Sequence, residues 1–385
     1  MLDNRRSFLG SASLLACLVA PASAQQRPSL SERGDGERNG PGRAALARPR
    51  SRNELAALLQ GAADTQTMAV LDPATDITID RTVEIVQRIS TSRSWGVIGN
   101  GAKIRSAIKD GTPVLKYTIA VADRQAGTNS RGLTIQGLDI AGCLRDGPCL
   151  MLHAPDAAGP LYRAILRDNT TTRSGGLGAL HIKGAVFELL VAGHISENNK
   201  RNGVAIEHEG NAIVSNCMIH ALNSSRNGSA GLLTRASAVD VVQASFINNG
   251  ECGINAPAGL RSAAFINGEN TGQFVIRVGG FANLYNCEAS TDGKTIQHDV
   301  ETGQALGRPT EALVSYSAFN QYADDLMLCG ACKLTGYNGG KGYLALVRQE
   351  SGSSAVWLEP WMDRTSVRRT AAGDVLPTIR QVVAA

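Results

Sequence analysis

The sequence predicts an all-β chain built as a parallel β-solenoid, in which short strands stack coil upon coil. Glycine supplies 42 of the 385 residues, about 11 % against a usual share of roughly 7 %, and aromatic residues make up only 4 %. From residue 68 onward, short β-rich runs alternate with Gly, Asn and Ser, and no long stretch has a helical period. One strand type also recurs, mostly after a glycine, at segments that begin 20 to 28 residues apart: 178–183, 203–208, 231–236, 253–258 and 273–278.

A repeat unit of this length, with two or three short strands, cannot bury a core alone. Stacked units can, because each strand hydrogen-bonds to its equivalent in the next coil about 4.8 Å away. Small and β-branched side chains suit the narrow interior, and the Asn pairs at 198–199 and 248–249 suit left-handed turns and amide ladders. We therefore expect the solenoid over residues 53–345 and a C-terminal flap and tail over 346–385.

A short capping helix is predicted over residues 53–60. Ser51 or Asn53 can serve as its N-cap, and Gly61 is the expected C-terminal stop. The helix has one apolar stripe that would cover the exposed edge of the first coil, formed by Leu55, Leu58 and Leu59.

The first 24 residues have the pattern of an export signal. Arg5 and Arg6 precede a short apolar run, and the small residues that end at Ala24 fit a cleavage site. The pattern resembles the twin-arginine signal, which a receptor reads to export folded proteins. We therefore expect the twin-arginine export machinery as a partner and a periplasmic or secreted location. A lipoprotein site at Cys17 is the alternative, and no segment predicts a transmembrane span.

The basic excess of the chain lies before the repeats. The net charge is +4, but nine basic and four acidic residues precede residue 53, which leaves 29 basic and 30 acidic residues in 53–385. The Arg-, Gly- and Pro-rich segment 25–52 is predicted to be a flexible linker. A body with almost no net charge and few aromatic residues argues against nucleic-acid binding.

The repeats and the N-terminal signal resemble the twin-arginine-exported bacterial repeat proteins of the pectate-lyase-like superfamily. The resemblance covers about residues 70–345 for the fold and 4–24 for the signal. It implies a single-stranded, right-handed parallel β-helix in which substrate lies along the outer face of one sheet. Members of this superfamily include polysaccharide lyases, hydrolases, epimerases and non-catalytic accessory proteins, so the fold alone does not fix the chemistry.

The glycine-opened strands supply a register for the outer face. With a side-chain period of two, the first and third residues after the glycine point inward, which places His181 inside, and the fourth residues point outward. His181 and His194 are accordingly expected to be structural histidines. A one-residue bulge would add two residues to the outer set. The outer set is then Ile182, Glu207, Arg235, Pro257 and Arg277, with Lys183 and His208 added by the bulge.

Lys183, Glu207, His208 and Arg235 are the candidate catalytic residues. A uronic-acid lyase removes the C5 proton with a base and neutralises the neighbouring carboxylate, onto which negative charge spreads. Lys183 or His208 would be the base and Arg235 the neutralising cation, while Glu207 would be an acid or a Ca²⁺ ligand. Arg277 is a candidate substrate-binding residue on the same face. The alternative is a solvated ladder of ion pairs between coils.

Two further patterns bear on substrate. Trp357 and Trp361 share one face of an extended strand, so they are candidates for stacking on sugar rings, or for packing of the C-terminal flap. Asp324 and Asp325 resemble the acidic pairs of β-helix hydrolases, but neighbouring strand residues point to opposite faces, so we expect a polar turn there. Apart from Ca²⁺ at Glu207, the sequence predicts no metal or cofactor.

Seven of the eight cysteines remain after removal of the signal. Cys143 and Cys149 flank Gly147-Pro148 and are candidates for a loop disulfide in an oxidising compartment. Cys329 and Cys332 are candidates for a second disulfide, since their redox-motif spacing lacks a βαβ context. The expected small buried fillers of the stack are Cys217, Cys252 and Cys287.

Two functions follow as expectations. The first is an exported β-helix protein that acts on a polysaccharide, in particular a uronate polymer, by lyase or related chemistry such as hydrolysis or epimerisation. The alternative is a non-catalytic glycan-binding protein, or an assembly or accessory protein of the cell envelope, that uses the same outer face.

Overall fold

The structure is a computed structural model that describes most of the chain between residues 46 and 291 and a set of strands beyond. The signal over 1–24, most of the linker, Asp324, Asp325 and Trp361 lie outside the described residues. The residues that the structure describes are 46–89, 93–121, 130–272, 274–291, 312–317, 326–329, 332–336, 345–351, 356–358, 367–369 and 379–381.

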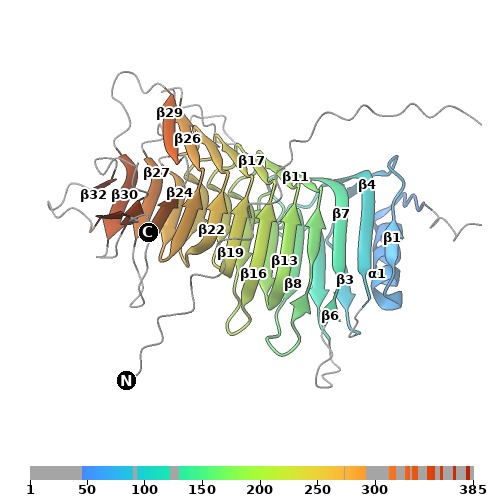
Figure 1. Cartoon of the computed structure of the whole chain (residues 1–385). Coiled ribbons are helices and arrows are strands. Elements are labelled where there is room, and N and C mark those ends of the chain that lie inside the picture. The colour runs from blue at the N-terminus through green and yellow to red at the C-terminus, as the bar shows by residue number, and fades with distance from the viewer. Residues whose placement is uncertain are drawn as a thin grey trace, which may run out of the picture. The chain divides into compact units, whose positions relative to one another are not determined.

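The unit Ala45–Ala385 is an all-β parallel β-helix that begins with one α-helix, as the sequence predicts (Figure 1). Each strand pairs in parallel with its equivalent in the next coil. One wall is an eleven-stranded sheet made of β3 (Val83–Gln87), β5 (Leu115–Ile119), β8 (Leu150–Ala154), β12 (Gly178–Gly184), β15 (Asn202–Glu207), β18 (Ala230–Thr234), β21 (Cys252–Ala256), β24 (Phe274–Gly279), β27 (Ala312–Ser317), β30 (Ala345–Ser351) and β32 (Val367–Arg369).

A 22-stranded sheet supplies two further rows of strands, which the long strands β4 (Trp95–Ser106) and β7 (Leu133–Ala141) join. The longer row contains β1 (Met68–Val70), β6 (Ser130–Arg131), β9 (Leu161–Tyr162), β10 (Ile165–Arg167), β13 (Val186–Ala192), β16 (Val214–His220), β19 (Ser237–Val242), β22 (Leu260–Ala264), β25 (Ala282–Tyr285), β28 (Leu326–Cys329), β31 (Val356–Leu358) and β33 (Ile379–Gln381). The shorter row contains β2 (Asp76–Ile79), β11 (Thr170–Thr172), β14 (Ile195–Glu197), β17 (Asn223–Ser225), β20 (Ser245–Ile247), β23 (Asn267–Glu269), β26 (Glu288–Thr291) and β29 (Lys333–Gly336).

The interior between the walls is filled by stacked apolar side chains. Val204 and Ile206 on β15 are fully buried, and in the next coil Leu232 and Thr234 occupy the paired positions. The inward register predicted for these two strands is confirmed. No helix in the described part of the chain is both long enough and apolar enough to cross a bilayer.

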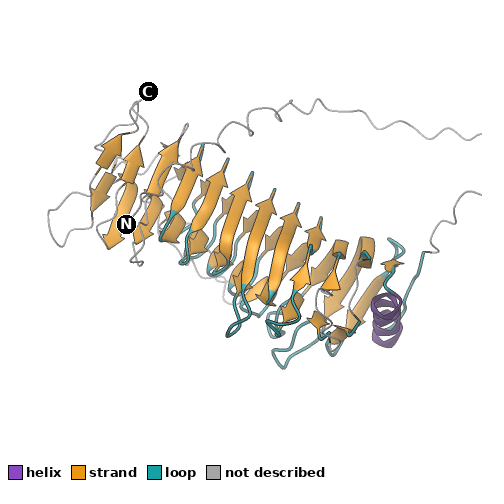
Figure 2. Ribbon diagram, turned by 60° about the horizontal axis from the view of Figure 1, so that its bottom comes forward, coloured by secondary structure: helices purple, strands orange, loops and turns teal. Residues whose placement is uncertain are grey.

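Helix α1 (Arg52–Thr65) covers the first coil and is longer than predicted (Figure 2). Ser51 is the N-cap, and its side chain accepts a hydrogen bond from the backbone N–H of Glu54. The predicted stop at Gly61 is wrong, because the apolar stripe continues through the buried Ala62 and Ala63. The helix ends where Gln66 takes a left-handed conformation and its N–H donates to the last carbonyls.

The C-terminal boundary also differs from the prediction. β30 pairs with β27 and β32, and β31 pairs with β28 and β33, so strands of the solenoid continue into the predicted flap over 346–385. Val347 pairs with Val314 on one side and Val367 on the other. These strands lack the opening glycine that marks the earlier repeats. The sequence pattern therefore does not reveal that the repeat continues there.

The coils turn through left-handed corner residues, and a buried amide ladder lies beside one corner. Asn198 and Asn248 have φ values of 55°, as predicted for asparagine in these turns. The buried Asn199, Asn227 and Asn249 stack on successive coils, and the Nδ2 of each of the first two donates to the Oδ1 of the next at 2.7 and 2.8 Å. The predicted amide ladder is therefore present.

The predicted pairing of Cys143 with Cys149 is absent. Both thiols are free, and they donate to different carbonyls, Cys143 to Ile108 and Cys149 to Thr172. Cys332 is buried, and the side chain of Cys329, its predicted partner, lies outside what the structure describes. Because the Cys143 and Cys149 thiols are held by carbonyls of different segments, their short sequence spacing does not bring the two sulfurs together. The cysteines expected to be small fillers of the stack are buried, as predicted: Cys217, Cys252 and Cys287.

His194 makes the stability of the β-helix dependent on pH. The imidazole is fully buried, its Nε2 lies 3.1 Å from Thr171 Oγ1, and burial lowers its pKa from 6.5 to about 3. Below pH 6.5 the unfolded chain binds a proton that the folded chain does not. The free energy of unfolding should therefore fall by about 1.4 kcal/mol per pH unit between pH 6.5 and 3 on account of this residue.

Urea unfolding at pH 7 and pH 5 checks this expectation. The His194→Gln variant should lose markedly less stability between the two pH values than the natural chain. His220→Gln, a change at a partly exposed histidine, is the matched control and should keep the full dependence. Equal pH dependence in the natural chain and in His194→Gln would show that His194 is not the source.

Candidate functional site

The outer face of the eleven-stranded sheet carries two rows of side chains that pass from coil to coil. Paired positions define both rows. The first row contains Glu84, Lys116, Met151, His181, Ala205, Leu233, Asn255 and Arg277. The second row contains Thr118, His153, Lys183 and Glu207. Arg235 follows the next strand, and its N–H donates to the Ile206 carbonyl at 2.8 Å.

Strand β12 is shifted by one residue from the predicted register. Gly178 pairs with Asn202, and Leu180 pairs with Val204. A one-residue shift exchanges the two faces of a strand. Ile182 is therefore buried, while His181 and Lys183 lie on the outer face, which corrects the prediction that His181 points inward and Ile182 outward.

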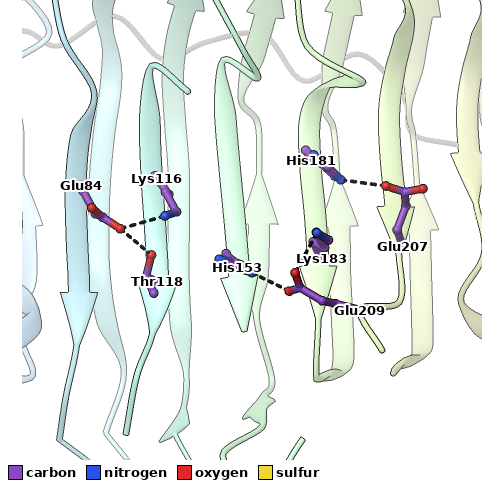
Figure 3. Close-up of polar contacts among 8 residues, drawn as sticks. All are labelled: Glu84, Lys116, Thr118, His153, His181, Lys183, Glu207 and Glu209. Atoms are coloured by element: carbon purple, nitrogen blue, oxygen red, sulfur yellow. Dashed lines mark hydrogen bonds and ion pairs between the residues drawn. The ribbon is translucent and has the colours of Figure 1, made fainter. Parts of the chain in front are cut away.

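His181, Glu207 and Arg235 form the first cluster of the site, and Figure 3 shows the contact between His181 and Glu207. His181 Nε2 lies 3.2 Å from Glu207 Oε2, and an Arg235 guanidinium nitrogen lies 3.5 Å from Glu207 Oε1. The His181 and Glu207 side chains are only 9 % and 14 % exposed, whereas Arg235 is 60 % exposed. A histidine and a carboxylate are thus held almost out of water on the outside of the β-helix.

Glu209 forms the second cluster from the turn that follows β15. Its carboxylate reaches back across two coils, to His153 Nε2 at 2.6 Å and to Lys183 Nζ at 2.8 Å (Figure 3). Two backbone hydrogen bonds of 2.9 Å between Glu209 and Ala212 hold the turn in place. No signal in the sequence predicts a role for His153 or Glu209, because neither belongs to a glycine-opened strand or to a recognisable motif.

His208 does not join these clusters. Its Nδ1 accepts the backbone N–H of Val214 at 3.0 Å, which closes the base of the same turn. Burial lowers the pKa of His208. The lone pair that proton abstraction would require is thus used within the turn, and we do not retain His208 as the catalytic base.

A third ion pair lies at the N-terminal side of the face. Glu84 accepts from Lys116 Nζ at 2.9 Å and from Thr118 Oγ1 at 3.0 Å (Figure 3). The hydrogen bond from Lys116 lowers the pKa of Glu84 against the opposing effect of burial. This pair has the geometry of the solvated inter-coil ladder that was the alternative interpretation of the outer face.

The electrostatics of the two histidine clusters differ. Burial lowers the pKa of His181, although the Glu207 charge opposes the shift, so the neutral imidazole is favoured. The hydrogen bond from Lys183 lowers the pKa of Glu209, which is therefore ionised at neutral pH. His181 Nδ1 has no hydrogen-bond partner among the described residues, whereas His153 Nδ1 is buried. Of the two imidazoles, His181 is the one that can offer a nitrogen to a ligand.

The other predicted site residues lie elsewhere. Arg277 is four coils from His181 along the first row, about 19 Å at the usual spacing. Trp357 lies on β31, which belongs to the 22-stranded sheet. The described residues hold no group of three or more His, Cys, Asp or Glu side chains able to bind a metal ion. Both Glu207 oxygens already face cationic or ring nitrogens, so this carboxylate is a poor Ca²⁺ ligand.

Comparison with known proteins finds similarity among solved structures alone. No protein-family model matches the chain, and no curated protein matches it. Among solved structures, ORF18 of Geobacillus virus E2 matches with a TM-score of 0.43 and 13 % sequence identity. The match covers 76 % of this chain and 54 % of the viral chain, so this chain spans about half the length of that protein.

Proposed function

We propose that this protein is an exported, pectate-lyase-like β-helix protein that binds a polysaccharide along the outer face of the eleven-stranded sheet and acts on it at His181. The supporting observation is the His181–Glu207–Arg235 cluster, in which a neutral imidazole and a carboxylate are nearly buried on an outer surface. Ionisable groups with shifted pKa values in such places are typical of functional sites.

A uronate polymer is the substrate class that fits this cluster best. Glu207 would orient the imidazole through Nε2, and Nδ1 would take the C5 proton of the sugar. Arg235 is 60 % exposed and touches Glu207 through one contact of 3.5 Å, so its guanidinium can turn to neutralise a uronate carboxylate. Lys183, which the sequence also offered as the base, is ion-paired with Glu209, and an ion-paired ammonium has no free lone pair.

The expected location is the periplasm or the extracellular space. The twin-arginine pattern over 4–24 supports export, and a lipoprotein anchored at Cys17 is the alternative. A polysaccharide of the cell envelope or its surroundings is the ligand that such a location would offer.

Turnover of uronate polymers tests the catalytic proposal. The purified chain should release unsaturated product, followed by ultraviolet absorbance, from at least one polymer of a broad panel. His181→Ala should lower kcat about a hundredfold or more, which is the usual contribution of a general base. Because the pKa of His181 is lowered, the rate should persist somewhat below pH 6.5 and fall once the imidazole is protonated.

Arg163→Gln is the matched control. Arg163 pairs with Glu188 at 2.9 Å between neighbouring coils of the other sheet, so its loss also breaks an exposed inter-coil ion pair. Its activity should equal that of the natural chain. Unsaturated product that forms equally well with His181→Ala would remove His181 from the mechanism.

A non-catalytic glycan-binding role is the second candidate, and charge balance on this face favours it. Lys116, Lys183 and Arg235 each already pair with a carboxylate. If no polymer is cleaved, shortened or epimerised, binding without turnover should still be lost in Arg235→Ala and kept in Arg163→Gln. If the chain neither cleaves nor binds any polymer of the panel, both the catalytic proposal and the glycan-binding proposal are contradicted.

A further inference from the structure

Cys287 and Cys332 occupy equivalent places in neighbouring coils. β25 pairs with β28, and β26 pairs with β29 so that Glu288 is the partner of Lys333. The two cysteines are the residues immediately before these partners. Equivalent positions of neighbouring coils are about 4.8 Å apart. This spacing lies within the Cα–Cα range of disulfides, about 4.4 to 6.8 Å.

Both side chains point into the same part of the interior. Cys287 is fully buried and Cys332 is 6 % exposed. The neighbouring Cys332 thiol is the largest cause of the raised pKa of Cys287. Their other partners are backbone carbonyls at 3.4 Å or more, and these are weak thiol hydrogen bonds whose loss costs little.

The remaining described cysteines lack such a neighbour. Cys217 pairs across the coils with Leu189 and Val239, and Cys252 pairs with Ala230 and Phe274. Cys143 and Cys149 bond to different carbonyls. Cys329 pairs with Tyr285. Among the cysteines of the described strands and turns, the register therefore brings together Cys287 and Cys332.

We propose that Cys287 and Cys332 form a disulfide that ties two coils of the C-terminal half together in an oxidising compartment. The two S–H bonds break and one S–S bond forms. The two electrons and two protons pass to a small disulfide such as oxidised glutathione, which is reduced to two thiols. The bond closes the chain between the two coils into a covalent loop, and such loops stabilise the folded state.

The order of folding and oxidation follows from burial. Only the thiolate attacks a disulfide, and the neighbouring Cys332 thiol together with burial raises the pKa of Cys287. Exchange should therefore be slow in the folded chain and fast while these coils are still forming. The bond is therefore expected to form quickly when the chain refolds in an oxidising buffer, and only slowly, through local opening of these coils, in a chain that is exported already folded.

Refolding tests the proposal. The full chain is unfolded with reductant and refolded in a mixture of reduced and oxidised glutathione. It is then alkylated under denaturing conditions and digested. Mass spectrometry should find one peptide pair that joins Cys287 to Cys332, and the number of free thiols should fall by two. Alkylation of both residues, or a bond from Cys332 to Cys329 in its place, would overturn the proposal.

Two comparisons keep the test decisive even if one variant fails to fold. Cys332→Ala should keep its remaining thiols free on oxidation, whereas Cys252→Ser, a change at another buried cysteine, should still form the bond. Without any variant, reductant should lower the thermal midpoint of the oxidised natural chain. An oxidised chain whose midpoint is unaffected by reductant would count against a stabilising bond at this position. None of these readouts depends on a polysaccharide.

Discussion

Replacing Gly184 by alanine should destabilise the β-helix by about 3 kcal/mol, which is the combined order of backbone strain and overpacking. Gly184 ends β12 with a φ of +103°, a conformation that residues with a Cβ rarely adopt. A Cβ at this position would also overlap the carbonyl oxygen of Ala154 in the preceding coil. That oxygen already accepts the N–H of Ala185 at 2.7 Å, so the coil cannot move away without breaking a hydrogen bond.

Gly101→Ala separates the two causes. Gly101 also has a positive φ, 85°, but a Cβ there meets no atom within 4 Å. This variant should lose only about 1 kcal/mol, the cost of the backbone conformation. Urea unfolding of both variants gives the comparison. Equal losses would mean that contact with the neighbouring coil is unimportant, and no loss in Gly184→Ala would contradict the packing described for this position.

The second large effect is expected at Asn227, the middle of the buried amide ladder. Asn227→Ala should cost about 3–5 kcal/mol, because several buried polar groups lose their partners at once. The Oδ1 of Asn227 accepts from the Nδ2 and the backbone N–H of Asn199, and its Nδ2 donates to Asn249 Oδ1 at 2.8 Å and Ser224 Oγ at 2.9 Å. No water can replace these bonds without entering a closely packed interior.

Asn211→Ala is the matched control, since Asn211 is exposed in a turn, and its stability should stay within about 0.5 kcal/mol of the natural chain. A double change at Asn199 and Asn227 should cost less than the sum of the two single changes, because the two side chains share one hydrogen bond. Additive losses in urea unfolding would show that the ladder does not act as a unit.

Much of the architecture was predictable because stacking imposes a repeat on the sequence. Glycine-opened runs, β-branched residues and paired asparagines all reflect contacts between equivalent residues of neighbouring coils. The prediction ended too early at residue 345 because the later strands keep the β-branched residues and lose the glycine. A helix stop at Gly61 was also expected, but buried alanines beyond it keep the helix in contact with the first coil.

The site was less predictable because it depends on register and on a turn. Gly178 looks equivalent to Gly203, yet it pairs with Asn202. This one-residue shift of the strand register places His181 on the outer face and not in the interior, where the sequence predicts it. Repeat lengths vary, so a glycine does not mark a fixed position in the coil. Glu209 joins the site from outside any strand, and a period-two pattern contains no information about such a contact.

The reach of Glu209 also limits how this chain can change during evolution. Solenoids can lengthen or shorten when a whole coil is duplicated or deleted, because each coil contacts only its neighbours. A coil inserted between β8 and β15 would move His153 about 4.8 Å farther from the Glu209 carboxylate that now lies 2.6 Å from it. Duplications before β8 or after β18 would spare both histidine clusters. Divergent descendants should therefore vary in coil number at the two ends and keep the segment from His153 to Arg235 at constant coil count.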